Sequence, residues 1–208
     1  MVLGLGTGST TTFFINALGK RVAQEHLRIA GIPTSHKTAA LARSLKIPIS
    51  TFAAHAHIDL TVDGADEVER GTLYLIKGHG GALLREKIVA AASKRLVIVA
   101  DETKEVDRLG SLVSVPVEVV KFGWQATQQK LQALGGNPSL RLGANKKLFV
   151  TDGGNYIMDC AFGPMEKPKE VAHRLDHVIG AVEHGLFLGF AKEVYVGGRS
   201  GVKVLKGG

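Results

Sequence analysis

Short β-branched runs alternate with helix-length segments over the first hundred residues, and no other feature of the sequence constrains the fold as strongly. The expected strands are Val2–Leu5, Leu27–Ile32, Ile58–Val62, Leu73–Ile76 and Leu96–Ala100, and the expected helices are Ser9–Val22, His36–Leu45 and Gly81–Ala92. Alternation of this kind predicts an α/β domain in which helices cover both faces of a parallel, Rossmann-like sheet. Functional residues are then expected at the carboxyl ends of the strands.

The pattern changes after Ser114, where strands and helices follow in a different order. The expected strands are 116–120, 140–142, 148–151, 156–162 and 181–188, with helices at 123–134 and 169–178 and a hairpin turn at 152–155. The order strand, helix, strands, helix, strand is typical of a ferredoxin-like α+β domain. We therefore expect residues 115–188 to form a smaller second domain. Residues 189–208 are expected to return to the first domain (1–114) as a hairpin around Gly197-Gly198.

Composition narrows the classes of partner. The formal net charge of +7 is distributed as +3, +1 and +3 over residues 1–114, 115–188 and 189–208, and the densest basic pairs carry no interleaved aromatic residues. This argues against nucleic acid and leaves a small anionic ligand open. No apolar run approaches the ~18 residues of a membrane helix, and the single cysteine, Cys160, is expected to be a small buried hydrophobe. We expect a cytoplasmic protein without a membrane partner or a cysteine-based metal cluster.

The first stretch with chemical potential is Gly4-Leu5-Gly6-Thr7-Gly8-Ser9-Thr10, between the opening strand and a helix. Glycines let the backbone approach a ligand, and free amides and hydroxyls at a helix start donate to an anion. The stretch lacks the Gly-Lys-Ser/Thr ending of a P-loop and the spacing of the dinucleotide fingerprint. It favours phosphate binding, and an ordinary turn capped by Ser9 or Thr10 is the alternative.

A second stretch, Val62-Asp63-Gly64-Ala65-Asp66-Glu67, places three carboxylates at the end of an apolar strand. Acidic loop residues often cap helices or face solvent. Here the strand end points toward the edge where ligands bind, and Gly64 and Ala65 leave room for one. Asp63 and Asp66 are therefore expected to face one pocket.

In the third stretch, Ile76-Lys77-Gly78-His79-Gly80-Gly81 leads into a helix that carries Glu86. Lys77 stands at a strand end before a glycine loop, a position suited to holding an oxyanion. Glu86 has no cationic neighbour three or four residues away, so it is either half-exposed or held in a desolvated pocket, as a general base requires. His79 is more typical of a turn residue than of an acid.

These three stretches, with Ala-Asp-x-x-Lys at 100–104, resemble in order and spacing the ribose-5-phosphate isomerase A family. The later stretches Pro116-Val117-Glu118-Val119 and Thr151-Asp152-Gly153-Gly154-Asn155 match as well, and the resemblance covers nearly the whole chain. It implies interconversion of ribose 5-phosphate and ribulose 5-phosphate in the pentose phosphate pathway. It also implies no metal or organic cofactor, a lid-like second domain, and a homodimer or homotetramer.

The resemblance also implies roles for single residues. Glu86 matches the catalytic base, Lys77 the group near the reacting oxygens, and Asp63 with Asp66 the carboxylates that bind sugar hydroxyls and assist ring opening. The substrate-binding positions implied are Thr7, Gly8, Ser9, Thr10, Asp63, Gly64, Ala65, Asp66, Lys77, Gly78, His79, Gly80 and Lys104. Family members have a helical segment before the first glycine-rich loop, whereas this chain begins at Met1 inside the first expected strand.

Two other classes compete with this interpretation. Sugar-phosphate effector domains of certain repressors share this kind of fold and bind without turnover, but they carry a helix-turn-helix that this sequence lacks. A nicotinamide dehydrogenase is not supported, because the glycine spacing does not match and no clear acidic residue follows the second strand. Ribulose 5-phosphate formation without added nucleotide would separate the three classes.

Overall fold

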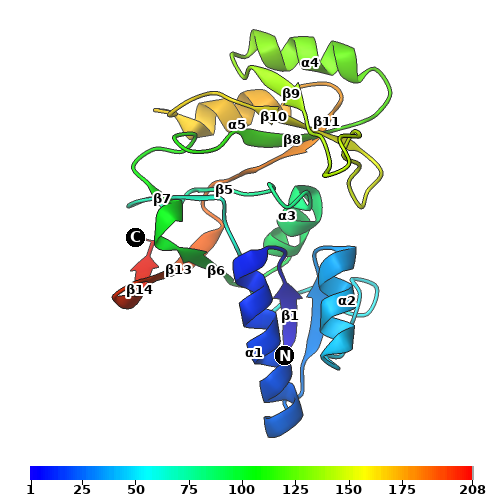
Figure 1. Cartoon of the computed structure of the whole chain (residues 1–208), viewed down its shortest axis with the longest axis vertical. Coiled ribbons are helices and arrows are strands. Elements are labelled where there is room, and N and C mark those ends of the chain that lie inside the picture. Colours follow the sequence, from blue (N-terminus) through cyan, green and yellow to red (C-terminus); the bar gives the residue numbers. More distant parts are fainter. Residues whose placement is uncertain (208) are drawn as a thin grey trace. The chain divides into compact units, whose positions relative to one another are not determined.

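The computed structural model describes residues 1–207 and divides the chain into two compact units (Figure 1). The first unit consists of Met1–Ala65, Arg85–Lys104 and the chain from Gly189 onward. The second consists of Asp66–Leu84 and Glu105–Leu188. Residues 66–84 and 105–114, expected from the sequence in the first domain, pack with the second unit.

The first unit is built on a six-stranded sheet with the order β14-β13-β6-β3-β1-β2. The strands are β1 (Val2–Leu5), β2 (Ala30–Pro33), β3 (Leu60–Asp63), β6 (Leu96–Asp101), β13 (Ala191–Gly198) and β14 (Gly201–Lys206). Neighbouring strands from β2 to β13 run parallel, and only β14 is antiparallel to its neighbour. The predicted parallel sheet and C-terminal hairpin are confirmed, although the hairpin turns at Arg199-Ser200 rather than at Gly197-Gly198.

Helices cover both faces of this sheet, as the alternation predicted. They are α1 (Ser9–Glu25), α2 (His36–Ser44) and α3 (Leu83–Ala91). Leu3 and Leu5 of β1 are buried in one cluster with side chains of α1 and α2. Gly4 between them faces α3, where an added Cβ would lie 2.6 Å from Val89 Cγ1. Because successive strand residues point to opposite faces, α1 and α2 cover one face and α3 the other.

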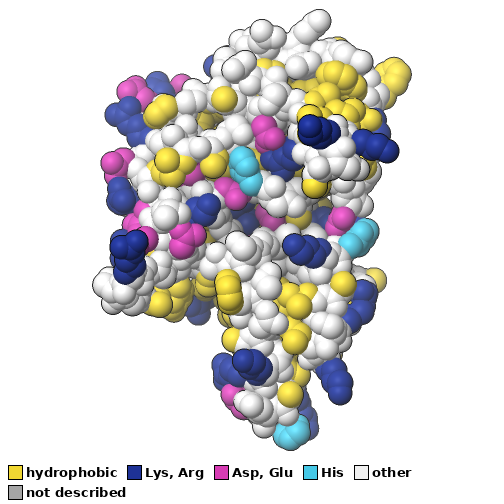
Figure 2. Space-filling view, in the orientation of Figure 1, with side chains coloured by type: hydrophobic (Ala, Val, Ile, Leu, Met, Phe, Trp, Pro, Cys, Tyr) yellow, Lys and Arg dark blue, Asp and Glu magenta, His cyan; other side chains and the backbone are white. Residues whose placement is uncertain are grey.

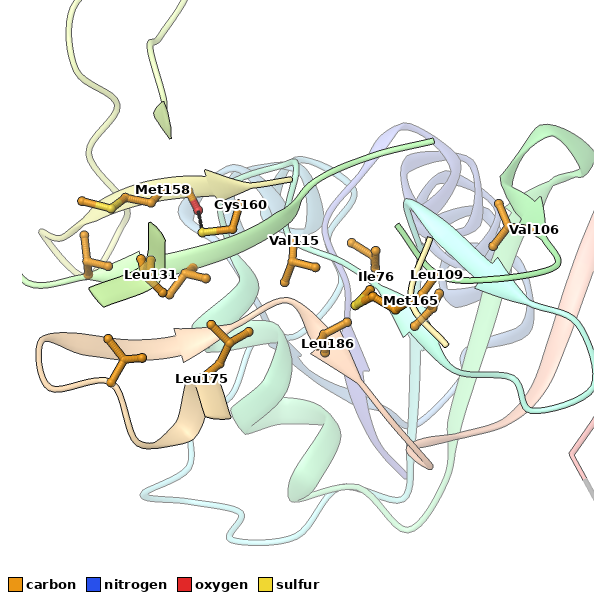
Figure 3. Close-up of a cluster of buried hydrophobic side chains, with 13 residues drawn as sticks. Ile76, Val106, Leu109, Val115, Leu131, Met158, Cys160, Met165, Leu175 and Leu186 are labelled. Carbon is orange, nitrogen blue, oxygen red and sulfur yellow. Dashed lines mark hydrogen bonds between the residues drawn. The ribbon is translucent and has the colours of Figure 1, made fainter. Parts of the chain in front are cut away.

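The second unit contains a four-stranded antiparallel sheet with the order β11-β8-β10-β9. Its elements in chain order are β8 (Val115–Val119), α4 (Trp124–Ala133), β9 (Pro138–Leu140), β10 (Tyr156–Cys160), α5 (Pro168–Asp176) and β11 (Ala181–His184). This confirms the predicted ferredoxin-like order. Figure 3 shows part of its core, where Leu131 and Leu175 of the two helices are buried with Met158 and Cys160. The Cys160 thiol is buried and donates to the Met158 carbonyl at 3.7 Å.

The prediction that Leu73–Ile76 joins the parallel sheet is wrong. Only Leu75–Ile76 forms a strand, β5, and it belongs to a third sheet with β4 (Glu67–Glu69), β7 (Glu105–Val106) and β12 (Leu186–Phe187). Gly71, at φ 83°, turns the chain back so that β5 pairs antiparallel with β4. A return to the parallel sheet would need a crossover of about a dozen residues, which the short connection after β3 does not provide.

Two further strand predictions fail for local reasons. Residues 148–151 form no strand, and only Leu148 makes a single bridge, to Leu142. The predicted strand 181–188 is broken at Gly185, whose N–H donates to the Pro116 carbonyl at 2.7 Å and whose carbonyl accepts the Lys77 N–H at 2.9 Å. The chain therefore leaves one sheet of the second unit after β11 and enters the other as β12.

The surface agrees with the dispersed charge of the sequence. On the face shown in Figure 2, Lys and Arg side chains are scattered among acidic and apolar ones and form no continuous patch. Among the described residues, no helix combines the length and the hydropathy that a membrane span requires.

Candidate functional site

The first group of predicted residues lies where β1, β3 and β6 end, at the carboxyl edge of the parallel sheet. The register pairs Leu5 with Val62 and Asp63 with Ile98, so the loops that follow these strands share one edge. Side chains in loops at this edge of a parallel sheet are the usual source of a ligand site.

Thr7 is the best-anchored residue of the loop after β1. Its N–H donates to Asp63 Oδ1 at 3.0 Å, and its hydroxyl donates to Ser35 Oγ at 2.8 Å. The same hydroxyl lies 2.7 Å from Thr34 Oγ1 and 3.1 Å from Thr38 Oγ1. Both hydrogen-bond donors of Thr7, its N–H and its hydroxyl, are thus engaged within the protein, and the residue holds the loop in place.

Asp63 ties this loop to the loop after β3. Its Oδ1 also accepts the Gly64 N–H at 2.7 Å, and its side chain is buried. Gly6 lies against it so closely that an added Cβ would fall 2.1 Å from Asp63 Oδ1. Gly64 is packed less closely, with an added Cβ 3.2 Å from Thr11 Oγ1. The two motifs of the sequence therefore fold as one interlocked structure.

The start of α1 is open to solvent at Gly8 and Ser9, whereas Thr10 is half-buried. Gly8, at φ 146°, precedes the helix without a side-chain cap, and the first turn contains no acidic residue. The first backbone N–H groups of a helix have no partner within the helix, and the helix dipole favours negative charge there. This end of α1 therefore suits an anion such as a phosphate.

Lys104 closes a short 3₁₀ turn, Glu102–Lys104, directly after β6 and is half-buried. Asp101 shapes the turn by accepting both the hydroxyl and the N–H of Thr103. The Thr103 hydroxyl is the largest cause that lowers the pKa of Asp101 below its ordinary value, and the nearby Lys104 adds to it. Asp101 is therefore an anion that orients the turn carrying Lys104.

Glu86 lies in the first turn of α3 and is buried, with 2% of its surface exposed. Of the two settings that the sequence allowed, half-exposed or enclosed, the structure has the enclosed one. The first turn of a helix is a favourable place for a carboxylate, because the helix dipole attracts negative charge there.

The second group belongs to the second unit and begins with Lys77. This lysine follows β5 directly and is 2% exposed, with its Nζ 5.4 Å from the centre of the Phe187 ring. Its N–H donates to the Gly185 carbonyl at 2.9 Å. A lysine enclosed in this way is held in one place, as a group that meets a developing negative charge must be.

The glycine loop that follows Lys77 is fixed by side chains from elsewhere in the unit. The His79 N–H donates to Asp66 Oδ2 at 3.0 Å, and the His79 ring donates from Nε2 to the Ser114 carbonyl at 3.0 Å. His79 is exposed and thus acts as the turn residue that the sequence favoured. Asp66 and the glycine loop, separate motifs in the sequence, are joined here.

Sequence reasoning missed the residues that support this loop. Arg141 Nη1 donates to the carbonyls of Gly78 at 2.8 Å and His79 at 3.1 Å, and its other nitrogens bind Asp159. The ring of Phe149 lies against Gly81, where an added Cβ would fall 2.3 Å from its Cζ. None of these three side chains belongs to a glycine-rich or acidic motif, so the sequence alone offered no signal for them.

Two acidic residues within the matched motifs have structural roles. The buried Glu67 accepts backbone N–H groups of Gly110 at 2.6 Å, Leu112 at 2.5 Å and Val113 at 2.9 Å. The buried Glu118 accepts the Thr151 hydroxyl and the Asn155 amide, both at 2.9 Å. The two later matching stretches of the sequence are thus joined by Glu118 inside the second unit.

A trio of Asp176, Glu183 and His184 has side-chain atoms close enough together to be considered as metal ligands. His184 Nδ1 accepts the Leu186 N–H at 3.2 Å, so a neutral ring carries its proton on Nε2. That nitrogen lies 3.0 Å from Asp176 Oδ1, to which it donates. His184 and Asp176 therefore form a hydrogen-bonded pair, and the neutral His184 ring has no free lone pair with which to bind a metal ion.

The structure thus gathers the predicted residues into two groups. The first unit carries Thr7, Gly8, Ser9, Thr10, Asp63, Gly64, Ala65, Glu86 and Lys104, and the second carries Asp66, Lys77, Gly78, His79 and Gly80.

Comparison with known proteins identifies the family. Residues 30–201 match the family model described as ribose 5-phosphate isomerase A (phosphoriboisomerase A). Among curated relatives, the ribose-5-phosphate isomerase A of Gluconobacter oxydans is 54% identical over 98% of this chain and 88% of its own length. That of a Synechococcus strain is 49% identical over 99% of this chain and 90% of its own length.

Solved structures of the same family are similar to this chain over nearly its whole length. The ribose 5-phosphate isomerase A of Methanocaldococcus jannaschii superposes with a TM-score of 0.94 at 41% identity, covering 99% of this chain and 91% of that one. A D-ribose-5-phosphate isomerase in complex with phospho-erythronic acid gives a TM-score of 0.95 at 40% identity, covering 99% and 90%.

Proposed function

Because the chain belongs to the ribose 5-phosphate isomerase A family, we propose that it interconverts D-ribose 5-phosphate and D-ribulose 5-phosphate through an enediolate. This reaction is an aldose–ketose isomerisation in the non-oxidative branch of the pentose phosphate pathway. The observation that carries the proposal is the burial of Glu86 in the first turn of α3. The reaction needs one enclosed carboxylate, and a protein that only binds sugar phosphates has no use for it.

Glu86 is the base in this proposal. Moving the carbonyl from C1 to C2 requires removal of the C2 proton and its return to C1, and one carboxylate can do both. The negative charge that develops on the two oxygens needs a fixed donor, and the enclosed Lys77 supplies one. Asp63 and Asp66 bind the sugar hydroxyls and assist ring opening.

The phosphate binds at the start of α1. Since both donor groups of Thr7 are engaged within the protein, Gly8, Ser9 and Thr10 provide the donors to the phosphate, and Thr7 holds their loop in place. Lys104, presented by the turn after β6, adds a positive charge. Gly64, Ala65, Gly78, His79 and Gly80 complete the substrate-binding residues through their backbone.

The reaction needs no metal or organic cofactor, and residues 115–188 serve as the lid-like domain that the family resemblance implies. The chain forms a homodimer or homotetramer, which sedimentation at several protein concentrations will test. The protein is cytoplasmic, and fractionation of cells that express it with a tag will test this location.

The test of the activity is ribulose 5-phosphate formation from ribose 5-phosphate in the presence of a chelator and without nucleotide. Turnover under these conditions is the expected result. Binding of phospho-erythronic acid without turnover would instead indicate a sugar-phosphate sensor. The probe is suitable because its planar carboxylate resembles an enediolate, and a protein 40% identical to this one binds it.

A further inference from the structure

The side chain of Arg141 connects the ferredoxin-like part of the second unit to the glycine loop. It follows β9 directly and lies 62 and 63 residues from the two loop carbonyls that it contacts. Its side chain is 11% exposed, and Asp159 of β10, which binds it through Nε and Nη2, is 21% exposed. A guanidinium held on one edge by a carboxylate has little freedom to turn, so Nη1 projects in one direction.

Nη1 donates to two consecutive carbonyls, those of Gly78 and His79. In a planar trans peptide the N–H points opposite to the carbonyl. The N–H groups of His79 and Gly80 must therefore point away from Arg141, on the other side of the loop. Consecutive N–H groups on one side of a loop form a concavity that attracts negative charge.

The hydrogen bond that one of these two N–H groups makes shows in which direction it points. The His79 N–H meets Asp66 Oδ2 at 3.0 Å. Asp66 is a carboxylate to which the proposed reaction assigns contact with sugar hydroxyls. Arg141 thus fixes the peptide that holds Asp66, and it does so next to Lys77.

We propose that Arg141, oriented by Asp159, is a positioning residue for the isomerisation. It holds residues 78–80 so that Asp66, the Gly80 N–H and Lys77 keep the arrangement that the enediolate requires. The inference rests on the proposed function and deepens it. Because Arg141 acts through the loop, its substitution should lower the rate of the chemical step.

The chemistry of the side chain explains why arginine is required here. Its planar fork serves a carboxylate on one edge and two carbonyls from another nitrogen at the same time. Lysine keeps the charge but has a single donor centre on a flexible chain. The Arg141→Lys variant therefore keeps the positive charge and loses the fork of hydrogen-bond donors, so it shows which of the two the loop requires.

The experiment compares Arg141→Ala, Arg141→Lys and Asp159→Asn with the wild type and with Arg108→Ala. Arg108 is the matched control because it pairs with Glu166 at 3.0 Å on the exposed surface of the same unit. For each protein we measure the melting temperature, phospho-erythronic acid binding, and kcat and KM well below the lowest melting temperature. Hydrogen exchange of a peptide covering residues 77–82 reports the loop itself.

We expect kcat to fall by on the order of 100-fold in Arg141→Ala and about tenfold in Arg141→Lys, because displacing a catalytic group by about 1 Å costs this much. KM should change far less, loop amides should exchange faster, and Asp159→Asn should behave like a milder Arg141→Lys. Arg108→Ala should match the wild type.

A loss of melting temperature with unchanged kcat in Arg141→Lys and Asp159→Asn would overturn the inference, since Arg141 would then be only structural. If Arg141→Ala does not fold, these two milder variants decide. A wild type that binds the probe without turnover would overturn the proposed function itself, and the catalytic role of Arg141 with it.

Discussion

The two glycine-rich loops of the proposed site follow strands in the same way but are fixed by different means. The loop after β1 is held by a close fit of its backbone against Asp63, since Gly6 lies directly on that residue and the Thr7 N–H donates to its carboxylate. Three neighbouring hydroxyl groups also bind the Thr7 side chain. The loop after β5 is held by side chains from distant positions, Arg141 and Phe149.

This difference has a consequence for how each loop tolerates change. A loop fixed by close backbone contact cannot accept an added atom, and its failure should appear as lost stability. A loop fixed by projecting side chains can lose one of them and remain folded, so such a substitution should mainly lower kcat. The following substitutions test this contrast.

The largest effect is expected from Glu86→Gln, which changes neither loop sequence and removes the proposed base. Isomerisation should fall by at least about 1,000-fold, within the range for loss of general acid–base catalysis, while phospho-erythronic acid still binds. Turnover and binding of the same preparation are measured. Glu25→Gln, which removes an exposed helical carboxylate of the same unit, is the control. Near-normal turnover in Glu86→Gln would exclude Glu86 as the base.

Gly6→Ala tests the backbone fit. The new Cβ would lie 2.1 Å from Asp63 Oδ1 and 2.6 Å from Asp63 Cα, so we expect unfolding free energy to fall by about 3 kcal/mol. Urea unfolding measures this loss. At Gly197 of β13 an added Cβ meets only the Ala100 carbonyl, at 3.9 Å, and Gly197→Ala should change stability by less than about 1 kcal/mol. Equal effects of the two substitutions would contradict the close fit.

Phe149→Ala tests the side-chain support of the second loop. Removing a half-buried ring that lies against Gly81 should lower kcat several-fold and cost only about 1 kcal/mol of stability. Kinetics and urea unfolding are compared with Leu148→Ala, which shortens the exposed neighbour. If Phe149→Ala lost stability as Gly6→Ala does and kept its kcat, the two loops would not differ in the way described.

The smallest effect concerns Cys160, in the core beside Asp159. Burial, with a smaller effect from the Asp159 charge, raises the pKa of this thiol from 9.0 to about 12. The free energy of unfolding that the buried, neutral thiol contributes is fully present below pH 9. It is lost as the pH rises toward 12, because the Cys160 thiol of the unfolded chain releases its proton at a lower pH than that of the folded chain. Between pH 8 and 10 the wild type should lose about 1 kcal/mol more than Cys160→Ala in urea unfolding. An identical pH dependence would contradict this.

The same contrast explains what the sequence could reveal. Thr7 and Asp63 both lie in motifs, and alternation of strands and helices brings their loops to one sheet edge. Both the parallel sheet and the ferredoxin-like order followed from such patterns. The β4–β5 hairpin did not, because Glu67 and Glu69 look like loop residues until Gly110, Leu112, Val113 and Thr72 are seen to bind them.

Arg141 illustrates the remaining limit in physical terms. A lone arginine between two leucines carries no local pattern, and its role depends on a strand pairing that sets Asp159 opposite Ser139. Likewise, the break at Gly185 depends on the Lys77 and Pro116 backbone groups that it meets. Such contacts arise from tertiary structure and leave no periodic signal.

The position of β13 within the sheet has a consequence for synthesis of the protein. This strand is an interior one, between β6 and β14, although residues 102–190 separate it from β6 in the sequence. Until β13 has been synthesised, β6 presents an unpaired edge rich in valine and isoleucine. Such an edge is prone to pairing with other chains. The nascent chain should therefore be prone to such pairing until β13 has emerged and covers that edge.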